Sequence, residues 1–557
     1  MARTIRVKPQ DKRKPVPPPL IGSFLLESIT TGMYGERKNA IREYVQNSFD
    51  GIQAAIETKV LREGAGRISL TLSPDKTTLV IYDNGIGLPH RIAVNTLTAV
   101  GASRKERGRQ AGFRGIGRLA GIAFTKTLRF RTKAAGDELE TVVEFDCEAL
   151  RTGMLNSGRK PAADLISACT TFDQERADDL DAHFFEVSLI GLKNAPAEAT
   201  DPLQMKAFLA QVAPVDFHPD FRAFRKQIFE EAEALEVPDL SDKEKDDKSA
   251  DNELVSDEAD WSILNDDAIS MLERIPVSFV TLIIRSGDPV REEPVFKPYR
   301  IRHAVYGSGD VVLKNVTVHI GPSGAWWGWI GHKAKPGKYL DDAVGGIRFR
   351  LKNIQIDGSE LITLVPTTND IRNPFGSWSN WFLGEIFVDP RAVVPNARRD
   401  NFEEDAQWLA IRAELNDICT ELTAEARRVS REHQTSVDVI DGKAEKIRSD
   451  YLSVIRAKTF NTTKAQKILK DSDNLQKDIE KASNGAPSAE QLRLKSLSKE
   501  LTQVRVSLLE KPKTPEYEQF RAAIRQEFLD KALIILNNYL EIDLYEEVKE
   551  ALEKGLR

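Results

Sequence analysis

Apolar and polar positions follow two periods along this chain, and each change of period marks an expected element. From about Phe24 to Leu61 apolar residues recur every three or four positions, which predicts helix. Residues 67–72 and 78–82 then alternate with period two, and the polar turn at 73–76 joins them as a hairpin. The first part of the chain is therefore expected to pack helix against sheet.

Strand periodicity returns in the middle of the chain and gives way to helix beyond Glu403. The strands expected there are 277–284, 299–305, 311–320, 346–356 and 384–388. Further on, the stretch 484–487 breaks two long helices, and Ser488 with Gln491 resembles a capping box. The order of elements predicts an α+β protein with an α/β part, a β-rich part and a helical C-terminal part.

Two features of the C-terminal helices concern assembly. Apolar residues recur three and four apart at Leu494, Leu497, Leu501, Val504 and Leu508. This spacing fits either a coiled-coil seam or packing within one helical domain. A last helix, near Gln519 to Leu556, carries a further apolar face. We interpret it as a dimerisation element, so a homodimer is expected.

Composition and charge narrow the class of protein. At 557 residues the chain is too long for a single core. Its 41% hydrophobic and 29% charged residues are ordinary for a soluble protein, and a net charge of −6 argues against a chain devoted to wrapping nucleic acid. No apolar run approaches the roughly 20 residues of a membrane span. The basic, proline-rich arm 1–20 lacks the apolar core of a secretory signal.

The cysteines indicate no metal site and no disulfide framework. Cys147, Cys169 and Cys419 lie far apart, and no Cys/His cluster has the spacing of a zinc site. We interpret them as reduced thiols. The expectation is a cytoplasmic protein without a membrane partner.

The first candidate for chemistry is a polar stripe on the first helical region. Glu43, Asn47 and Asp50 stand at i, i+4 and i+7, so they share one helical face. A carboxylate and a carboxamide one turn apart suit a base for water and an oxygen ligand for Mg²⁺. Such a stripe alone is more often a solvated face, so its interpretation depends on the motifs that follow.

The second candidate is the stretch Asp83 to Leu88, which follows a strand directly. Gly85 and Gly87 let the backbone approach a flat ligand closely. The carboxylate of Asp83 can accept a hydrogen bond from an exocyclic amine such as that of adenine. Alone, this motif is also typical of an ordinary turn.

The third candidate is glycine-rich. Gly112, Gly115 and Gly117 lead into the helix-like segment 118–124, and backbone N–H groups at such a helix start bind phosphate oxygens. The preceding stretch 101–109 is polar and basic, which fits a mobile lid or a solvated loop equally well. The glycines lack the terminal Lys-Ser/Thr of a P-loop, and no βαβ unit surrounds them.

In order and spacing these motifs, Glu-x-x-x-Asn-x-x-Asp, Asp-x-Gly-x-Gly and Gly-x-x-Gly-x-Gly, resemble those of the GHKL ATPases. That superfamily includes DNA gyrase, the MutL and MORC proteins, sensor histidine kinases and the ninety-kilodalton heat-shock chaperones. The resemblance covers the chain from 21 to 195. It implies a GHKL α/β sandwich that binds ATP and Mg²⁺ between helices and sheet.

The resemblance also implies a role for individual residues. It makes Glu43 the general base, Asn47 the Mg²⁺ ligand and Asp83 the adenine contact. Because histidine kinases replace the base, Glu43 favours hydrolysis of ATP over phosphotransfer to histidine. The other nucleotide-binding residues that it implies are Asp50, Gly85, Gly87, Ser103, Lys105, Gly112, Arg114, Gly115, Ile116 and Gly117.

The sequence departs from the family in one respect. The family usually closes this domain with a Gly-Thr pair on a strand, and the threonine touches the nucleotide. The corresponding strand here, 183–189, has no threonine, so that contact stays unassigned. His183 at its start is expected to be a surface or strand-edge residue.

The remaining chain fits the layout of the heat-shock chaperones within this superfamily. The mixed-charge segment 239–260 resembles their charged linker, and the β-rich part resembles their transducer domain. The expected layout is an extended arm 1–20, the ATPase domain 21–195, a helical connector and charged linker 196–260, a transducer-like domain 261–405, a helical hairpin or coiled coil 406–510, and C-terminal dimerisation helices 511–557.

Two features of the expected transducer-like domain are candidates for contacts beyond it: an arginine pair and a group of tryptophans. In the chaperones, a segment similar to 395–402 carries an arginine that reaches the γ-phosphate; aligning the Pro-Asn pairs puts it at Arg399, with Arg398 the alternative. Trp326, Trp327 and Trp329 lie among glycines, which suggests a loop whose exposed tryptophans bind protein, with core burial the alternative. Core burial is the preferred interpretation of two further tryptophans, Trp378 and Trp381.

Together, these expectations predict that the protein is an ATP-dependent conformational clamp. Because the expected order of domains most resembles that of the heat-shock chaperones, the preferred interpretation is chaperone-like action on protein clients. A rival is a MORC-like or MutL-like ATPase that clamps nucleic acid, for instance in prokaryotic genome defence, and salt-sensitive DNA binding separates the two. A third, non-enzymatic interpretation is a scaffold that senses nucleotide without turning it over, against which Glu43 argues.

Overall fold

The computed structural model divides the chain into two compact units, Met1–Ala424 and Glu425–Arg557, which are described separately. Within them the structure describes residues 22–28, 36–101, 117–156, 161–238, 259–264, 266–356, 358–365, 374–396, 398–434, 436–457, 460–483, 488–510, 515–537 and 542–556.

The first unit contains an eight-stranded sheet in the order β5-β4-β3-β6-β2-β1-β7-β8. The strands are β1 Arg67–Leu72, β2 Thr78–Asp83, β3 Thr127–Lys133, β4 Leu139–Asp146, β5 Thr170–Arg176, β6 Phe184–Ile190, β7 Thr281–Ser286 and β8 Arg291–Pro294. The expected hairpin is confirmed, since β1 and β2 pair antiparallel with Leu70 opposite Ile81. β1 and β7 pair in parallel, with Ile68 opposite Leu282.

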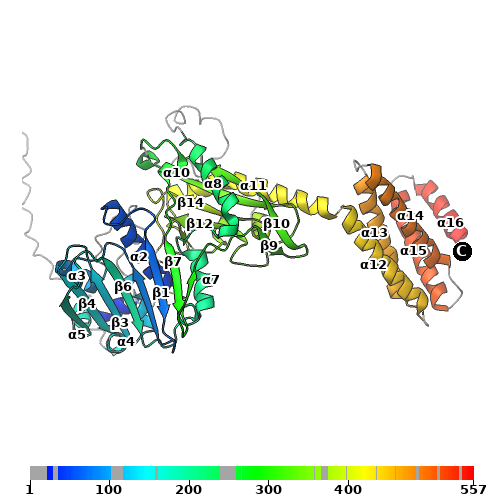
Figure 1. Ribbon diagram of the computed structural model, residues 1–557. Coiled ribbons are helices and arrows are strands. Elements are labelled where there is room, and N and C mark those ends of the chain that lie inside the picture. The colour runs from blue at the N-terminus through cyan, green and yellow to red at the C-terminus, as the bar shows by residue number, and fades with distance from the viewer. Residues whose placement is uncertain are drawn as a thin grey trace, which may run out of the picture. The chain divides into compact units, whose positions relative to one another are not determined.

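Helices cover this sheet, and Figure 1 shows α2 lying against it. They are α1 Ser23–Glu27, α2 Asn39–Glu57, α3 His90–Thr98, the 3-10 helix η2 Gly117–Ala123, α4 Cys147–Asn156, α5 Ala162–Ala168, α6 Ala197–Thr200 and α7 Pro202–Val212. Apolar residues of α2 such as Ile41, Val45 and Phe49 are buried in the same core as Leu70 and Ile81. The apolar face of α2 therefore packs on the sheet, while Glu43, Asn47 and Asp50 lie on a different face of the helix.

Part of the expected helix from Phe24 to Leu61 differs in the structure. The described residues form two helices, α1 and α2, and α2 ends at Glu57. Lys59 has φ +60°, a left-handed conformation that stops a helix. The apolar periodicity beyond Thr58 therefore belongs to the turn that follows α2.

A second, six-stranded sheet lies in the same unit, in the order β13-β12-β14-β11-β10-β9. Its strands are β9 Arg302–Val305, β10 Gly309–Ile320, β11 Trp326–Lys333, β12 Gly346–Leu351, β13 Ile354–Ile356 and β14 Leu383–Val388. The single strand expected over 346–356 is a hairpin, because Lys352 and Asn353 both have positive φ. Helices α8 Arg222–Ala234 and α10 Met271–Arg274 accompany this sheet.

The three neighbouring tryptophans occupy a central strand of the second sheet. Every residue of β11 is buried, and Trp326, Trp327 and Trp329 are each at most 1% exposed. The interpretation as an exposed loop is therefore wrong, and the alternative of core burial is correct. The glycines have a packing role, since a Cβ on Gly328 would lie 2.6 Å from the backbone O of Glu385 on the neighbouring strand. Trp378 and Trp381 are half-buried and contact each other.

A buried ion cluster ties the second sheet to the end of α7. Lys297 Nζ donates to Glu385 Oε2 at 2.6 Å, and Arg350 Nε donates to Glu385 Oε1 at 2.5 Å, with all three side chains fully buried. Although burial favours the neutral acid, Arg350 and Lys297 hold the pKa of Glu385 below its usual value. Arg350 Nη2 also donates to the backbone O of Gln211 at 2.7 Å, so the cluster joins the two halves of the unit.

The course of the chain between the sheets differs from the expected layout. The range 261–405 was expected to form one transducer-like domain, but β7 and β8 are strands of the first sheet. The backbone N of Val280 donates to the O of Pro214 at 3.0 Å, and that of Lys297 to the O of Asp216 at 2.9 Å. Hydrogen-bonded strands and connectors therefore join the two sheets.

Long helices form the C-terminal part of the chain. They are α11 Ala406–Gln434, α12 Val437–Arg456, α13 Thr462–Ser483, α14 Ser488–Glu510, α15 Pro515–Asn537 and α16 Ile542–Leu556. Leu494, Leu501 and Leu508 of α14 are buried together with residues of α12 and α13, which supports packing within one helical domain. The single last helix expected near 519–556 is two helices, α15 and α16.

The remaining observations concern membrane spans, metal clusters and cysteines. No helix in the described part of the chain is long and apolar enough to cross a membrane. The described residues hold no group of three or more His, Cys, Asp or Glu side chains placed to bind a metal. The cysteines are free thiols. Burial raises the pKa of Cys147 to about 11 and that of Cys419 to about 12, so both thiols stay protonated.

Candidate active site

Helix α2 presents its polar stripe at a fixed position in the first sheet domain. Glu43 and Asp50 are each 7% exposed, and Asn47 between them is half-buried. Tyr44, next to Glu43, donates its hydroxyl to the backbone O of Arg118 at 3.1 Å and accepts from the N of Gly121 at 2.8 Å. These two bonds hold the carboxylate-bearing helix against η2.

The turn after β2 packs directly on α2. Asp83 is 1% exposed, and its Oδ1 accepts from the backbone N of Gly85 at 2.9 Å. The N of Ile86 donates to the O of Gly51 on α2 at 3.0 Å. A Cβ on Gly85 would lie 2.7 Å from the backbone C of Gly51, so the close approach requires glycine. Gly87 has φ +65° and equally little room.

Two further residues contact this turn: His183, expected from the sequence only as a surface or strand-edge residue, and Thr132, which sequence reasoning missed. His183 Nδ1 lies 2.9 Å from the backbone O of Gly85, so His183 supports the turn rather than standing at a free surface. Thr132, fully buried on β3, accepts from the N of Leu88 at 2.8 Å and donates to the O of Phe184 at 3.0 Å. β3 holds two threonines, Thr127 and Thr132, so no signal in the sequence singles out Thr132.

The strand expected to carry the family threonine is β6, which lies between β2 and β3. In the sheet register Phe185 on β6 stands opposite Asp83 on β2 and opposite Thr132 on β3. A threonine is therefore present near the turn, but on β3, one strand further from Asp83. Strand pairing, which the sequence alone does not reveal, decides this placement.

The glycine-rich segment is described only at its end. Ser103, Lys105, Gly112, Arg114, Gly115 and Ile116 lie outside the described residues. Gly117, the first residue of η2, lies against the carboxylate of Glu43, because a Cβ there would be 2.4 Å from Glu43 Oε2. Glycine at this position lets the segment run directly past Glu43.

Arg399 reaches this site from the other half of the unit. Its Nε lies 3.0 Å from Glu43 Oε1, and its Nη1 donates to Gln46 Oε1 on the same helix. Both charged side chains are buried, at 11% and 9% exposure. Arg398 has an exposed side chain, and only its backbone O is engaged, by Arg42 Nη2 at 3.2 Å. The structure thus brings Arg399, rather than Arg398, to Glu43.

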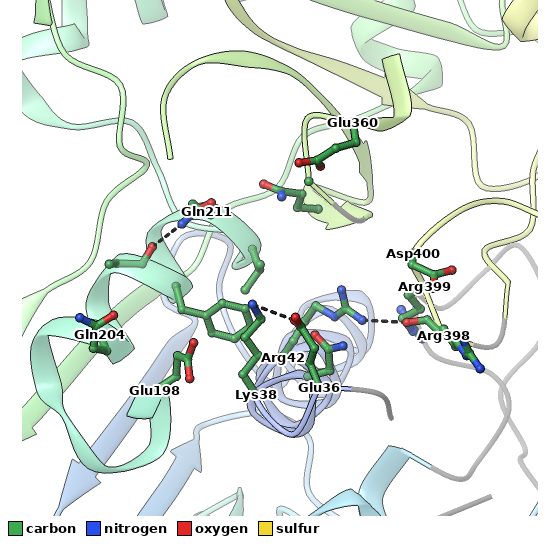
Figure 2. Close-up of a pocket in the computed structure, with 16 residues that line it drawn as sticks. Glu36, Lys38, Arg42, Glu198, Gln204, Gln211, Glu360, Arg398, Arg399 and Asp400 are labelled. Atoms are coloured by element: carbon green, nitrogen blue, oxygen red, sulfur yellow. Dashed lines mark hydrogen bonds and ion pairs between the residues drawn. The ribbon is translucent and has the colours of Figure 1, made fainter. Parts of the chain in front are cut away.

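The segment that carries Arg399 approaches α2, and Figure 2 shows Arg399 beside Arg398 and Asp400, with Arg42 nearby. Pro395 and Phe402 form an antiparallel bridge at its base. Asn396 Nδ2 donates to Asp400 Oδ1 at 2.6 Å, and the N of Asp400 donates back to Asn396 Oδ1 at 3.3 Å. Arg399 has φ +59°, a left-handed conformation that is costly for a non-glycine residue and common at functional sites.

A cavity of about 670 Å³ lies beside this turn (Figure 2). Residues of α2, α6, α7 and β13 line it together with Arg398, Arg399 and Asp400. Its charged side chains are of both signs, including Lys38, which pairs with Glu36 at 2.8 Å. Arg399 therefore stands between this cavity and Glu43.

The residues present fit a magnesium–nucleotide complex. Asn47 offers a carboxamide oxygen, a ligand type that Mg²⁺ accepts, within one turn of the Glu43 carboxylate. Asp83 offers a buried carboxylate beside a turn whose glycines leave no room for side chains. A guanidinium at the other end of the stripe suits the charge of a terminal phosphate. The arrangement can orient a water molecule, accept its proton and stabilise phosphoryl charge.

The Asp83 carboxylate can be tested by a conservative change. We expect Asp83→Asn to weaken ATP binding by a factor of about ten to a hundred, because the amide presents a donor where the adenine amine also donates. Calorimetry with ATP measures this, and Asp75→Asn, on the exposed β1–β2 turn, is the control. Unchanged affinity in the Asp83 variant would exclude the adenine contact.

Comparisons with known proteins find similarity in the part of the chain that carries these residues. Residues 35–174 match the family described as histidine kinase-, DNA gyrase B-, and HSP90-like ATPase. The chaperone protein HtpG of Alcanivorax borkumensis is 26% identical over 144 residues, which cover 23% of this chain and 23% of that protein. HtpG of Psychrobacter arcticus is 27% identical over 139 residues, 22% of this chain and 21% of that protein.

The aligned region thus spans less than a quarter of the length of these relatives, and the matched family region holds α2, the Asp83 turn and η2. The motifs, the α/β architecture and the family match coincide on the same residues. Residues 35–174 of this chain are therefore a domain of the GHKL ATPase superfamily, in an α+β protein.

Proposed function

We propose that this protein hydrolyses ATP to ADP and phosphate in the presence of Mg²⁺. The contact of Arg399 with Glu43 supports this most, because it brings a cation from a distant part of the chain to the proposed base. Glu43 accepts the proton of the attacking water, Asn47 provides an oxygen to the metal, and Asp83 accepts from the adenine amine. Arg399 stabilises charge on the transferred phosphoryl group.

The proposed activity is coupled to the position of the second sheet. Arg399 follows β14 of that sheet, whereas Glu43 lies on α2 of the first domain. Hydrolysis therefore depends on how closely the turn 395–402 approaches α2, which is how conformational steps commonly control ATPases. We propose a clamp that acts on protein clients, as the similarity to HtpG chaperones suggests.

The direct test is phosphate release by the purified full-length chain with ATP and Mg²⁺. We expect turnover that Glu43 and Arg399 variants reduce. Absence of turnover, with intact ATP binding, would instead favour the nucleotide-sensing scaffold. DNA binding that weakens steeply with salt would favour the nucleic-acid clamp over the chaperone-like function.

The C-terminal helices carry the proposed dimer interface. Phe528 on α15 is 69% exposed and Leu544 on α16 is 50% exposed, so both apolar side chains are available for contact with a second copy of the chain. We expect the double variant Phe528→Glu/Leu544→Glu to be monomeric at concentrations where the wild type is a dimer, with a dissociation constant raised about thirtyfold or more.

Light scattering over a concentration series measures this shift. Val506→Glu on α14, where Val506 is 43% exposed, is the matched control and should leave association unchanged. A stable dimer in the double variant would place the interface elsewhere in the chain.

A further inference from the structure

Gln46 is a buried polar residue for which neither the family motifs nor the proposed reaction has a use. It lies on α2 three residues after Glu43, at a position that the motif Glu-x-x-x-Asn leaves open. Its side chain is 1% exposed. Its Oε1 accepts from Arg399 Nη1, so it touches the same guanidinium as Glu43.

Folding stability does not explain a glutamine at this place. Within the described residues, the buried Nε2 of Gln46 has no hydrogen-bond partner. Burying an amide N–H without a partner is unfavourable, and an apolar side chain of similar size would avoid that cost. Among the described residues, the hydrogen bond recorded for the Gln46 side chain is the one to Arg399.

Glu43 and Gln46 contact different edges of the planar Arg399 guanidinium. Nε of Arg399 faces Glu43 at 3.0 Å, and Nη1 faces Gln46. The contact with Glu43 is an ion pair, and the contact with Gln46 is a hydrogen bond. Since the donors of a guanidinium have a fixed fork geometry, the two contacts on one helix constrain its orientation as well as its position. A single ion pair would leave the group free to rotate about the contact.

Glu43 and Gln46 also differ in how their charge changes during the proposed reaction. Glu43 loses its negative charge when it accepts the proton of water, which weakens its hold on Arg399 as phosphoryl charge develops. The amide oxygen of Gln46 does not titrate, so its bond to Arg399 persists through that step.

We propose that Gln46 is a positioning residue that holds Arg399 in its catalytic orientation on α2. This inference rests on the proposed ATP hydrolysis and deepens it. It requires that removal of the amide lower turnover through Arg399 alone, without weakening the fold.

Gln46→Leu tests this requirement, because leucine fills the space but offers no acceptor. We expect kcat to fall about tenfold to a hundredfold, as for the loss of a hydrogen bond to a charged group, with KM for ATP within about threefold. The midpoint of thermal unfolding should stay the same or rise. Gln53→Leu, on the same helix but outside the contact, is the control and should keep the wild-type kcat.

The double variant Gln46→Leu/Arg399→Ala separates positioning from general damage to α2. If Gln46 acts through Arg399, its removal should have less than a twofold effect on kcat once Arg399 is alanine. A full additional loss in that background, a lowered unfolding midpoint, or an unchanged kcat in Gln46→Leu would each overturn the inference. Failure of the proposed function is seen separately, as wild-type chain that does not turn over ATP or as full activity in Glu43→Ala.

Discussion

Glu43→Ala should lower ATP turnover by about 10² or more while leaving ATP affinity within a few-fold of the wild type. General-base catalysis contributes about 10² to 10⁴ to a rate, and alanine cannot take a proton from water. The nucleotide contacts proposed for Asp83 and Asn47 stay in place in this variant. Phosphate release and calorimetry with ATP measure the two quantities separately.

Two companion variants refine this result. Glu43→Gln keeps an acceptor for Arg399, so a loss as large as that in Glu43→Ala assigns the effect to the base and not to the ion pair. Glu57→Ala, at the exposed end of the same helix, should be fully active. Turnover that survives in Glu43→Gln at the wild-type rate would remove Glu43 from the role of base.

Arg399→Ala should reduce turnover by about tenfold to a thousandfold with near-normal ATP affinity. An arginine that acts on the developing phosphoryl charge contributes to the transition state more than to binding, so kcat falls while affinity stays. Arg399→Lys should recover little, because an ammonium cannot reach Glu43 and Gln46 with the fork of a guanidinium. Single-turnover kinetics with saturating ATP measure the chemical step directly.

Arg398→Ala is the matched control for this prediction. Arg398 is the neighbouring residue with an exposed side chain, and the bond from Arg42 to its backbone O survives the change. We expect near-normal turnover. The opposite result, a defect in Arg398→Ala alone, would mean that the turn rearranges when nucleotide binds.

Short motifs were enough to predict where several of the candidate site residues lie in the fold. Asp83, Gly85 and Gly87 follow a strand directly, so their spacing alone places the turn at the end of β2. Helical geometry alone places Glu43, Asn47 and Asp50 on one face. Arg399 required an alignment to a similar segment, because no local pattern reveals which distant loop approaches a helix.

Residues that depend on strand pairing could not be predicted. Thr132 and His183 meet the Asp83 turn only because β3 and β6 take their places beside β2. The tryptophans of β11 were misread for a related reason, since glycines that suggest a loop also occur where central strands pack closely. Gln46 escaped notice because its partner, Arg399, is far away in the sequence.

The parallel pairing of β1 with β7 has a practical consequence for dissecting this protein. Any N-terminal fragment that stops short of Val280 loses Val280, Leu282 and Ile284 from the core of the first domain. It also turns β1 into a sheet edge whose backbone groups from Arg67 to Thr71 have lost their partners. Such edges pair readily with other chains, so aggregation of a short ATPase fragment would reflect the cut and not the nature of the domain.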